Sequence, residues 1–294
     1  MTTAHDVFQA HRNLLFSLAY DILGSVADAE DTVQETWLRW SGVDHAGVGN
    51  PRAYLVRITT RLALDQVTRA RSAREDYVGP WLPEPLWTER PESGGDPAED
   101  VVRAQTVAFG LMVVLETLSP LERAAFVLRE AFGFEHSEIA VILARSPAAV
   151  RQLVHRAREH VQARRPRFAA ERAVAQAAAE RFLDAALGGS FDGLMEVLAP
   201  DVTLWFDGGG QVRTALRPIR GNDKVSRLLA VVARTDRPLD VRWSRGDGPP
   251  TALMLADGTP LGVLTVVTTP GGELIREVYG LLNPAKLTHL RPAE

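Results

Sequence analysis

Arginine side chains are concentrated in two short segments of this 294-residue chain. Residues 51–74 contain six arginines and one aspartate, and residues 145–165 contain six arginines and one glutamate. The only lysines, Lys224 and Lys286, lie in the C-terminal half. Because a guanidinium is planar and carries several N–H donors, arginine blocks suit bidentate contacts to phosphates and base edges. The two segments therefore favour nucleic-acid binding over an ordinary solvated surface.

An acidic segment separates the two basic blocks. Residues 75–100 contain eight acidic residues and one arginine, and they are rich in proline and glycine, which is typical of a linker. The whole chain has a net charge of −4, so the distribution of charge is more informative than the sum. An acidic linker can occupy a positively charged channel as a nucleic-acid mimic, and it can offset the basic blocks in the free protein.

The composition excludes several kinds of chemistry. The chain has no cysteine, which excludes disulfides, a cysteine nucleophile and cysteine-ligated metal sites. The seven histidines form no HxH or HxxxH pair, so we expect neither a metal site nor a cofactor. The N-terminus has no secretory signal, and no apolar run is long enough to cross a membrane. We therefore expect a cytoplasmic protein that does not bind membranes.

The periodicity of apolar residues predicts a change of fold along the chain. Helical spacing extends over residues 7–40 with a break at Gly24 and Ser25, over 52–74, over 101–133 and over 166–190. From about Val202, strand-like runs alternate with glycine and proline turns. The sequence thus predicts two all-α domains, a helical bundle and a helix-turn-helix, followed by an α+β domain with a mostly antiparallel sheet. The expected strands cover residues 202–206, 240–244, 251–255, 261–269 and 273–282, with one helix near 223–233.

Residues 134–163 have the pattern of a helix-turn-helix. The first helix is expected from Ser137 to Leu143, and Ser146 with Pro147 is a favoured start for the second. The turn lacks the glycine often found there, and an ordinary helical hairpin is the alternative interpretation. The second helix would place an exposed face in the major groove of DNA. This face carries Ser146, Ala149, Arg151, Gln152, His155, Arg156 and Arg158.

Residues 24–40, GSVADAEDTVQETWLRW, resemble the polymerase-binding helix of extracytoplasmic-function sigma factors. The resemblance implies docking on a coiled coil of the RNA polymerase large subunit, with aromatic anchors surrounded by charges. An acidic amphipathic surface helix is the alternative. The implied polymerase-binding residues are Asp28, Glu30, Asp31, Gln34, Glu35 and Trp37.

The next segment, residues 50–74, is similar to the helix of that family that melts promoters and reads the −10 element. Arg61 stands where the family commonly has asparagine, so the local base contact is expected to differ. The preceding loop, residues 41–50, would capture a base flipped from the non-template strand. The helix-turn-helix then corresponds to the domain that reads the −35 element. The resemblance assigns −10 contacts to Asn50, Arg52, Arg57, Arg61, Asp65, Arg69 and Arg71.

Three further motifs narrow the resemblance to the SigJ-like subfamily, which carries a SnoaL-like C-terminal domain. They are YVGPWLPEPL in the linker, DGGGQV at 207–212 and NPAKL at 283–287, although Gln211 and Ala285 replace the usual lysine and aspartate. The resemblance spans roughly residues 5–290 and implies a cone of helices against a curved sheet, with a pocket for a small ligand. We expect the cone to regulate the factor through contacts with the linker. The expected contact residues are Trp81, Leu82, Pro83, Leu86, Asp207, Gly208, Gly209, Gly210, Asn283, Pro284, Lys286 and Leu287.

The predicted protein is an alternative sigma factor whose partners are core RNA polymerase and promoter DNA, and which is monomeric when free. The expected domains are residues 1–76 for polymerase and −10 binding, 77–104 for the linker, 105–165 for −35 binding and 166–294 for the regulatory cone.

Two other functions are compatible with parts of the sequence. A one-component transcription regulator with a ligand-binding cone would not need the polymerase-docking pattern. A SnoaL-like enzyme would need a general base in the pocket. Asp207 is expected in a turn, His289 near the surface, and Tyr279 and Trp205 in the core. We therefore expect no catalytic residue and no enzymatic activity.

Overall fold

The computed structural model divides the chain into two compact units. The first contains residues 3–75 and 111–164, and the second contains residues 76–86 together with most of 171–290. The part of the expected linker beyond Leu86 lies outside the described residues. The structure describes residues 3–86, 109–164, 171–232, 239–244 and 248–290.

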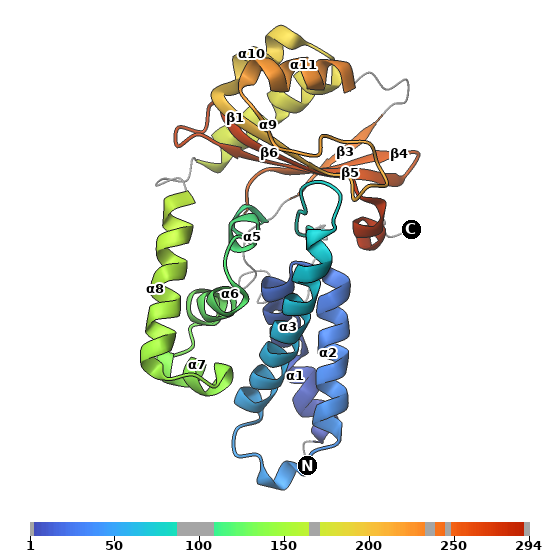
Figure 1. Cartoon of the computed structure of the whole chain (residues 1–294). Coiled ribbons are helices and arrows are strands. Elements are labelled where there is room, and N and C mark those ends of the chain that lie inside the picture. The colour runs from blue at the N-terminus through green and yellow to red at the C-terminus, as the bar shows by residue number, and fades with distance from the viewer. Residues whose placement is uncertain (1–2, 87–108, 165–170, 233–238, 245–247, 291–294) are drawn as a thin grey trace. The chain divides into compact units, whose positions relative to one another are not determined.

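Three helices form one half of the first unit (Figure 1): α1 (Ala4–Leu23), α2 (Val26–Ser41) and α3 (Pro51–Glu75). The predicted break between α1 and α2 is confirmed. Gly24 adopts a left-handed conformation with φ 75°, and the side chain of Ser25 caps α2. Trp40 is buried at the end of α2, and its indole N–H donates to the carbonyl of Ala4 at 2.8 Å. A short 3₁₀ turn, His45–Gly47, precedes α3.

The other half of the first unit contains the predicted helix-turn-helix. The helix α7 (His136–Leu143) is followed by α8 (Pro147–Arg164), and Val150 and Val154 point into the core as expected. The helix expected over 101–133 is interrupted in its described part, because Ser119 and Pro120 start a new helix with a capping box. Its segments are α5 (Phe109–Leu115), α6 (Pro120–Phe126) and the π-helical turn η2 (Val127–Ala131).

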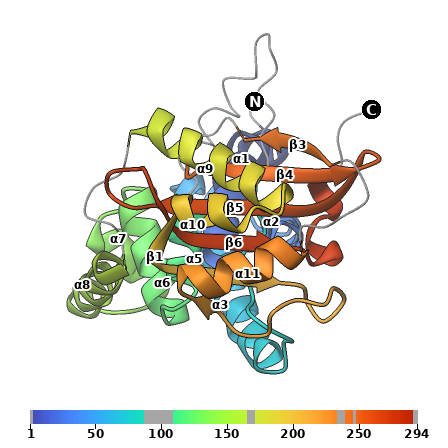
Figure 2. The same cartoon turned by 90° about the horizontal axis from the view of Figure 1, so that it is seen from above.

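The second unit is an α+β domain with a mixed six-stranded sheet in the order β2-β1-β6-β5-β4-β3. Three helices cover one face of this sheet in both views (Figures 1 and 2): α9 (Arg172–Leu187), α10 (Phe191–Val197) and α11 (Asn222–Val232). The five predicted strands are confirmed, whereas β2 was missed because it has two residues. The strands are β1 (Leu198–Asp207), β2 (Ile219–Arg220), β3 (Asp240–Trp243), β4 (Thr251–Ala256), β5 (Thr259–Thr268) and β6 (Ile275–Leu281).

The core of the second unit lies between these helices and the sheet. Alanines of α9 allow close approach, and Phe182 fills the space between α9 and the strands. The ring of Phe206 lies directly over Gly280, where a Cβ would clash with the ring. Phe206 and Gly280 are paired on the neighbouring strands β1 and β6, so the glycine leaves room for the ring.

The neighbouring strands β1 and β6 run parallel, with Asp207 opposite Leu281. The other strand pairs of the described sheet are antiparallel. Since the carboxyl ends of parallel neighbours lie at the same edge, the residues after β1 and after β6 leave the sheet together. The backbone N–H of Leu282 donates to the carbonyl of Asp207 at 2.7 Å. This single parallel pair brings the DGGGQV and NPAKL motifs side by side.

Two further short turns, Pro284–Lys286 and Thr288–Leu290, follow β6. Asn283 caps the first of them by accepting from the backbone N–H of Ala285 at 3.1 Å. This cap fixes the direction in which Lys286 leaves the backbone.

Candidate functional site

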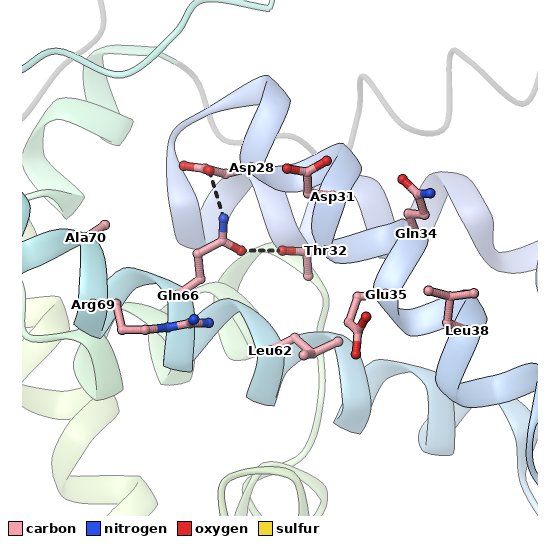
Figure 3. A pocket seen from close by; sticks show the side chains of 10 residues that line it. All are labelled: Asp28, Asp31, Thr32, Gln34, Glu35, Leu38, Leu62, Gln66, Arg69 and Ala70. Carbon is pink, nitrogen blue, oxygen red and sulfur yellow. Dashed lines mark hydrogen bonds between the residues drawn. The ribbon is translucent and has the colours of Figure 1, made fainter.

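An open groove of about 630 Å³ runs between α2 and α3 (Figure 3). Its α2 wall carries Asp28, Asp31, Gln34 and Glu35, four of the six residues expected to bind polymerase. These acidic and amide groups favour a cationic partner. The α3 wall and the end of the groove contribute Leu62, Gln66, Arg69, Ala70 and Leu38.

The other two expected polymerase-binding residues lie elsewhere on α2. Trp37 packs against α1, with its ring centroid 5.1 Å from Phe8 and 5.4 Å from His5. Glu30 is exposed but does not line the groove. On the α2 side of the groove, an apolar side chain is supplied by Leu38, which is 58% exposed. Trp37 shares the helix face of the buried Val33 and Trp40, whereas the next residue, Leu38, points roughly 100° away from it.

The residues expected to contact the −10 element are distributed around α3. Asn50 caps the helix by accepting from the backbone N–H of Ala53 at 3.0 Å. Arg57 lies over the ring of Tyr54, and Asp65 is exposed. Arg69 lines the groove between α2 and α3, whereas Arg52 and Arg61 do not. The side chain of Arg71 lies outside the described part of the structure.

Arg52 and Arg61 contact the half of the unit that contains the helix-turn-helix. The guanidinium of Arg61 donates to the carbonyl of Ile142, near the end of α7, at 3.3 Å. That of Arg52 lies 5.0 Å from the ring centroid of Phe134. The buried Arg123 on α6 pairs with Glu116 and donates to the carbonyl of Asp21 on α1 at 2.9 Å. Arginines therefore connect the two halves of this unit.

The expected DNA-reading face of α8 is exposed. Ser146 accepts from the backbone N–H of Ala149 at 3.2 Å and so begins the helix. Arg151, Gln152 and His155 project into solvent, whereas two arginines turn toward neighbouring elements. Arg156 pairs with Glu122 at 3.2 Å and Arg158 with Glu130 at 2.6 Å.

The second unit holds the linker motif at a buried carboxylate. Asp207 is completely buried, and its Oδ2 accepts from the ammonium of Lys286 at 2.8 Å and from the backbone N–H of Leu82 at 2.9 Å. The same ammonium donates to the carbonyl of Leu82 at 2.6 Å and lies 3.9 Å from the ring centroid of Trp81. The pair thus binds both polar backbone groups of Leu82.

Tyr77 attaches the beginning of the linker motif to the same carboxylate. Its hydroxyl donates to Oδ1 of Asp207 at 2.5 Å and accepts from the amide of Asn283 at 2.8 Å. Gly209, with φ 56°, also donates its backbone N–H to Asp207, and a Cβ there would clash with Asn283. Glycine is therefore required for the close approach of these segments.

The remaining residues of the expected contact surface surround this cluster. The backbone carbonyl of Pro85 lies 3.0 Å from Nε2 of His289. Pro83 and Leu287 are buried, Leu86 is half-buried, and Pro284 and Ala285 are exposed. Gly208 is buried behind Asp207, whereas Gly210 and Gln211 are exposed. We call residues 77–86 together with Asp207, Asn283 and Lys286 the linker clamp.

The sequence indicated a turn at Asp207 and named it among the contact residues, but it assigned no contact to Tyr77, Gln66 or His289. Asp207 ends β1 and is the common acceptor of the linker clamp, although it also starts the Gly209 turn. Tyr77 belonged to the quoted linker motif, but nothing in the sequence assigned its partner. Gln66 and His289 carried no motif signal. All three depend on contacts between distant segments, which composition does not reveal.

Neither a membrane-spanning helix nor a metal-binding cluster is found in the described part of the chain. No described helix is both long and apolar enough to cross a membrane. Among the same residues, no group of three or more His, Cys, Asp or Glu side chains could hold a metal ion.

Comparison with known proteins identifies both helical segments. Residues 7–73 match the Sigma-70 region 2 family, and residues 109–161 match Sigma-70, region 4. These are the segments that form the two halves of the first unit, so the protein is a sigma factor.

Two relatives and one solved structure identify the family to which this sigma factor belongs. The chain is 43% identical over 229 residues to the ECF RNA polymerase sigma factor SigJ of Mycobacterium tuberculosis, covering 77% of this chain and 72% of that protein. It is 30% identical over 287 residues to the probable ECF sigma factor SigI of the same species, covering 97% and 94%. The crystal structure of SigJ matches with a TM-score of 0.72 and 34% identity, covering 96% of this chain and 97% of that chain. The chain belongs to the extracytoplasmic-function sigma factor family.

Proposed function

We propose that this alternative sigma factor docks on core RNA polymerase through the groove between α2 and α3. The supporting observation is that four of the expected docking residues, Asp28, Asp31, Gln34 and Glu35, line one continuous surface. Three carboxylates on this surface suit a cationic partner helix, and the exposed Leu38 supplies an apolar contact at the end of the groove.

Promoter reading is divided between two helices of the first unit. The arginines of α3 contact the −10 region, and the exposed face of α8 around Arg151 and Gln152 contacts the −35 region. In the free protein, Arg52 and Arg61 are engaged with the helix-turn-helix half. Promoter binding through these two arginines therefore requires that both contacts be released.

The C-terminal unit regulates initiation through the linker clamp. Residues 77–86 begin the connection between the two DNA-reading segments, and Asp207 and Lys286 hold both polar groups of Leu82. The clamp shortens the free length of that connection. Because the reach of a flexible linker depends on its length, holding this stretch changes how the two DNA-reading segments can be spaced.

The test is transcription by the full-length chain with purified core polymerase on a set of promoter fragments that differ in the spacing between −35 and −10. Asp207→Asn should change the amount of transcript and the preferred spacing, because the ion pair that holds Leu82 is lost. Asp201→Asn, in the same strand and at an exposed pair with Arg276, is the matched control. Identical spacing preference for Asp207→Asn and the unsubstituted chain would refute regulation by the clamp. Failure of the unsubstituted chain to bind core polymerase would refute the docking proposal.

A further inference from the structure

Gln66 is a residue of the promoter-reading helix α3 whose side chain points into the acidic groove (Figure 3). It bridges two residues one turn apart on α2. Its amide nitrogen donates to Oδ1 of Asp28 at 2.7 Å, and its amide oxygen accepts from the hydroxyl of Thr32 at 2.9 Å.

The two hydrogen bonds fix the orientation of the amide. A carboxylate only accepts, so the nitrogen must face Asp28, and the hydroxyl of the buried Thr32 then donates to the oxygen. If the amide were turned over, its oxygen would face Asp28, and the carboxylate would lose its donor. The contact therefore defines one relative position of α2 and α3 at this level of the groove.

The bridge also has an electrostatic consequence. Asp28, Asp31 and Glu35 line the same groove as Arg69, and Glu35 is paired with Arg39 at 3.0 Å. A cationic residue in place of Gln66 would neutralise the charge of Asp28 that a cationic partner recognises. A neutral amide holds the carboxylate of Asp28 and leaves its charge in place.

We infer that Gln66 is a positioning residue for polymerase docking, which acts through Asp28. It orients that carboxylate toward the groove and connects the docking helix α2 to the promoter-reading helix α3. The inference rests on the proposed docking function of the groove and adds a residue of α3 to the determinants of polymerase affinity.

The affinity of the full-length chain for core polymerase tests this role. Gln66→Leu removes the donor to a charged acceptor and should weaken binding about tenfold. Gln66→Glu preserves the shape but places a negative charge beside Asp28. If the groove recognised polymerase by net charge alone, this variant would bind more tightly, whereas loss of positioning makes it bind more weakly. Gln9→Leu, at an exposed position of α1, is the matched control and should bind like the unsubstituted chain.

A double-mutant cycle with Asp28→Asn separates positioning from a general structural role. In the Asp28→Asn background, Gln66→Leu should weaken binding much less than in the unsubstituted chain, because the two residues act as a unit. Additive effects, tighter binding by Gln66→Glu or unchanged binding by both Gln66 variants would overturn the inference. If Gln66→Leu does not fold, as judged by circular dichroism, the affinity of Gln66→Glu for core polymerase tests the inference.

The same titration distinguishes failure of this inference from failure of the docking proposal. Asp31→Asn and Glu35→Gln lack the bridge to α3 but line the same groove. If they weaken binding and the Gln66 variants do not, only the positioning role is wrong. If none of the four substitutions changes the affinity, the groove is not the docking surface.

Discussion

Single residues decide how the linker is held, and Asp207 carries most of this role. Its two oxygens accept from Tyr77, Leu82, Gly209 and Lys286, so the buried charge is fully satisfied. The side chain of Lys286 is 9% exposed and that of Asp207 is 0% exposed. A buried pair of this kind is costly to break from one side, because the remaining charge has no counter-ion.

We therefore expect Lys286→Met to destabilise the C-terminal unit by about 3–5 kcal/mol. The double variant Lys286→Met with Asp207→Asn should recover part of this loss, since no uncompensated charge is left. The free energies of unfolding from denaturant titration measure both effects. A double variant less stable than Lys286→Met would show that the carboxylate is satisfied by its other donors alone.

At the scale of elements, helix ends set the geometry of the helix-turn-helix. Ala144 ends α7 in a left-handed conformation with φ 52°, where L-residues are strained by roughly 1–2 kcal/mol. Ala144→Gly should raise the free energy of unfolding of the first unit by about 0.5–1 kcal/mol, measured by denaturant titration. Ala10→Gly, at an exposed interior position of α1, should instead lower it by about 1 kcal/mol. Equal losses in both variants would mean that Ala144 is not strained.

The capping box at the start of α6 predicts a pH dependence. Burial disfavours ionisation of Glu122, but hydrogen bonds from the side chain and backbone of Ser119 and the nearby charge of Arg156 outweigh it and lower the pKa of Glu122 below its ordinary value of 4.5. A lowered carboxyl pKa stabilises the folded state fully above the unfolded value, and this contribution is lost as pH falls through the folded value.

Ser119→Ala should therefore cost about 1 kcal/mol at pH 7, and the difference from the unsubstituted chain should shrink below about pH 4. Thermal denaturation of both chains at several values from about pH 3 to about pH 7, which spans the titration of carboxyl groups, measures this difference. A difference that stays constant over this range would exclude a contribution from the ionised Glu122.

The whole molecule consists of two units with separate cores. Two compact units are expected to unfold in separable transitions when their cores are independent. In calorimetry of the full chain, Lys286→Met should lower the midpoint temperature of the transition of the second unit and leave that of the first unit unchanged. Ala144→Gly should raise only the midpoint temperature of the first unit. A single transition that both substitutions shift would show that the units unfold together.

Some of these features could be predicted from the sequence, and others only in part. The two-helix break at Gly24 and Ser25, the start of α8 at Ser146 and five of the six strands followed from local rules of capping and periodicity. The groove was predicted in part, because helical spacing groups Asp28, Asp31 and Glu35. The family resemblance also assigned a polymerase contact to Trp37, and in the structure this ring packs against Phe8 of α1.

The sequence by itself determined the class of the protein, the order of its helices and strands and the motifs that mark its surfaces, because these depend on short stretches of chain. Only the tertiary structure decided which of those motifs meet. Asp207 and Lys286 are 79 residues apart, and they form a pair because β1 and β6 run parallel and end at the same edge. Gln66 reaches Asp28 because α2 and α3 pack side by side. Local propensity cannot specify such contacts, since they depend on how complete elements pack against each other.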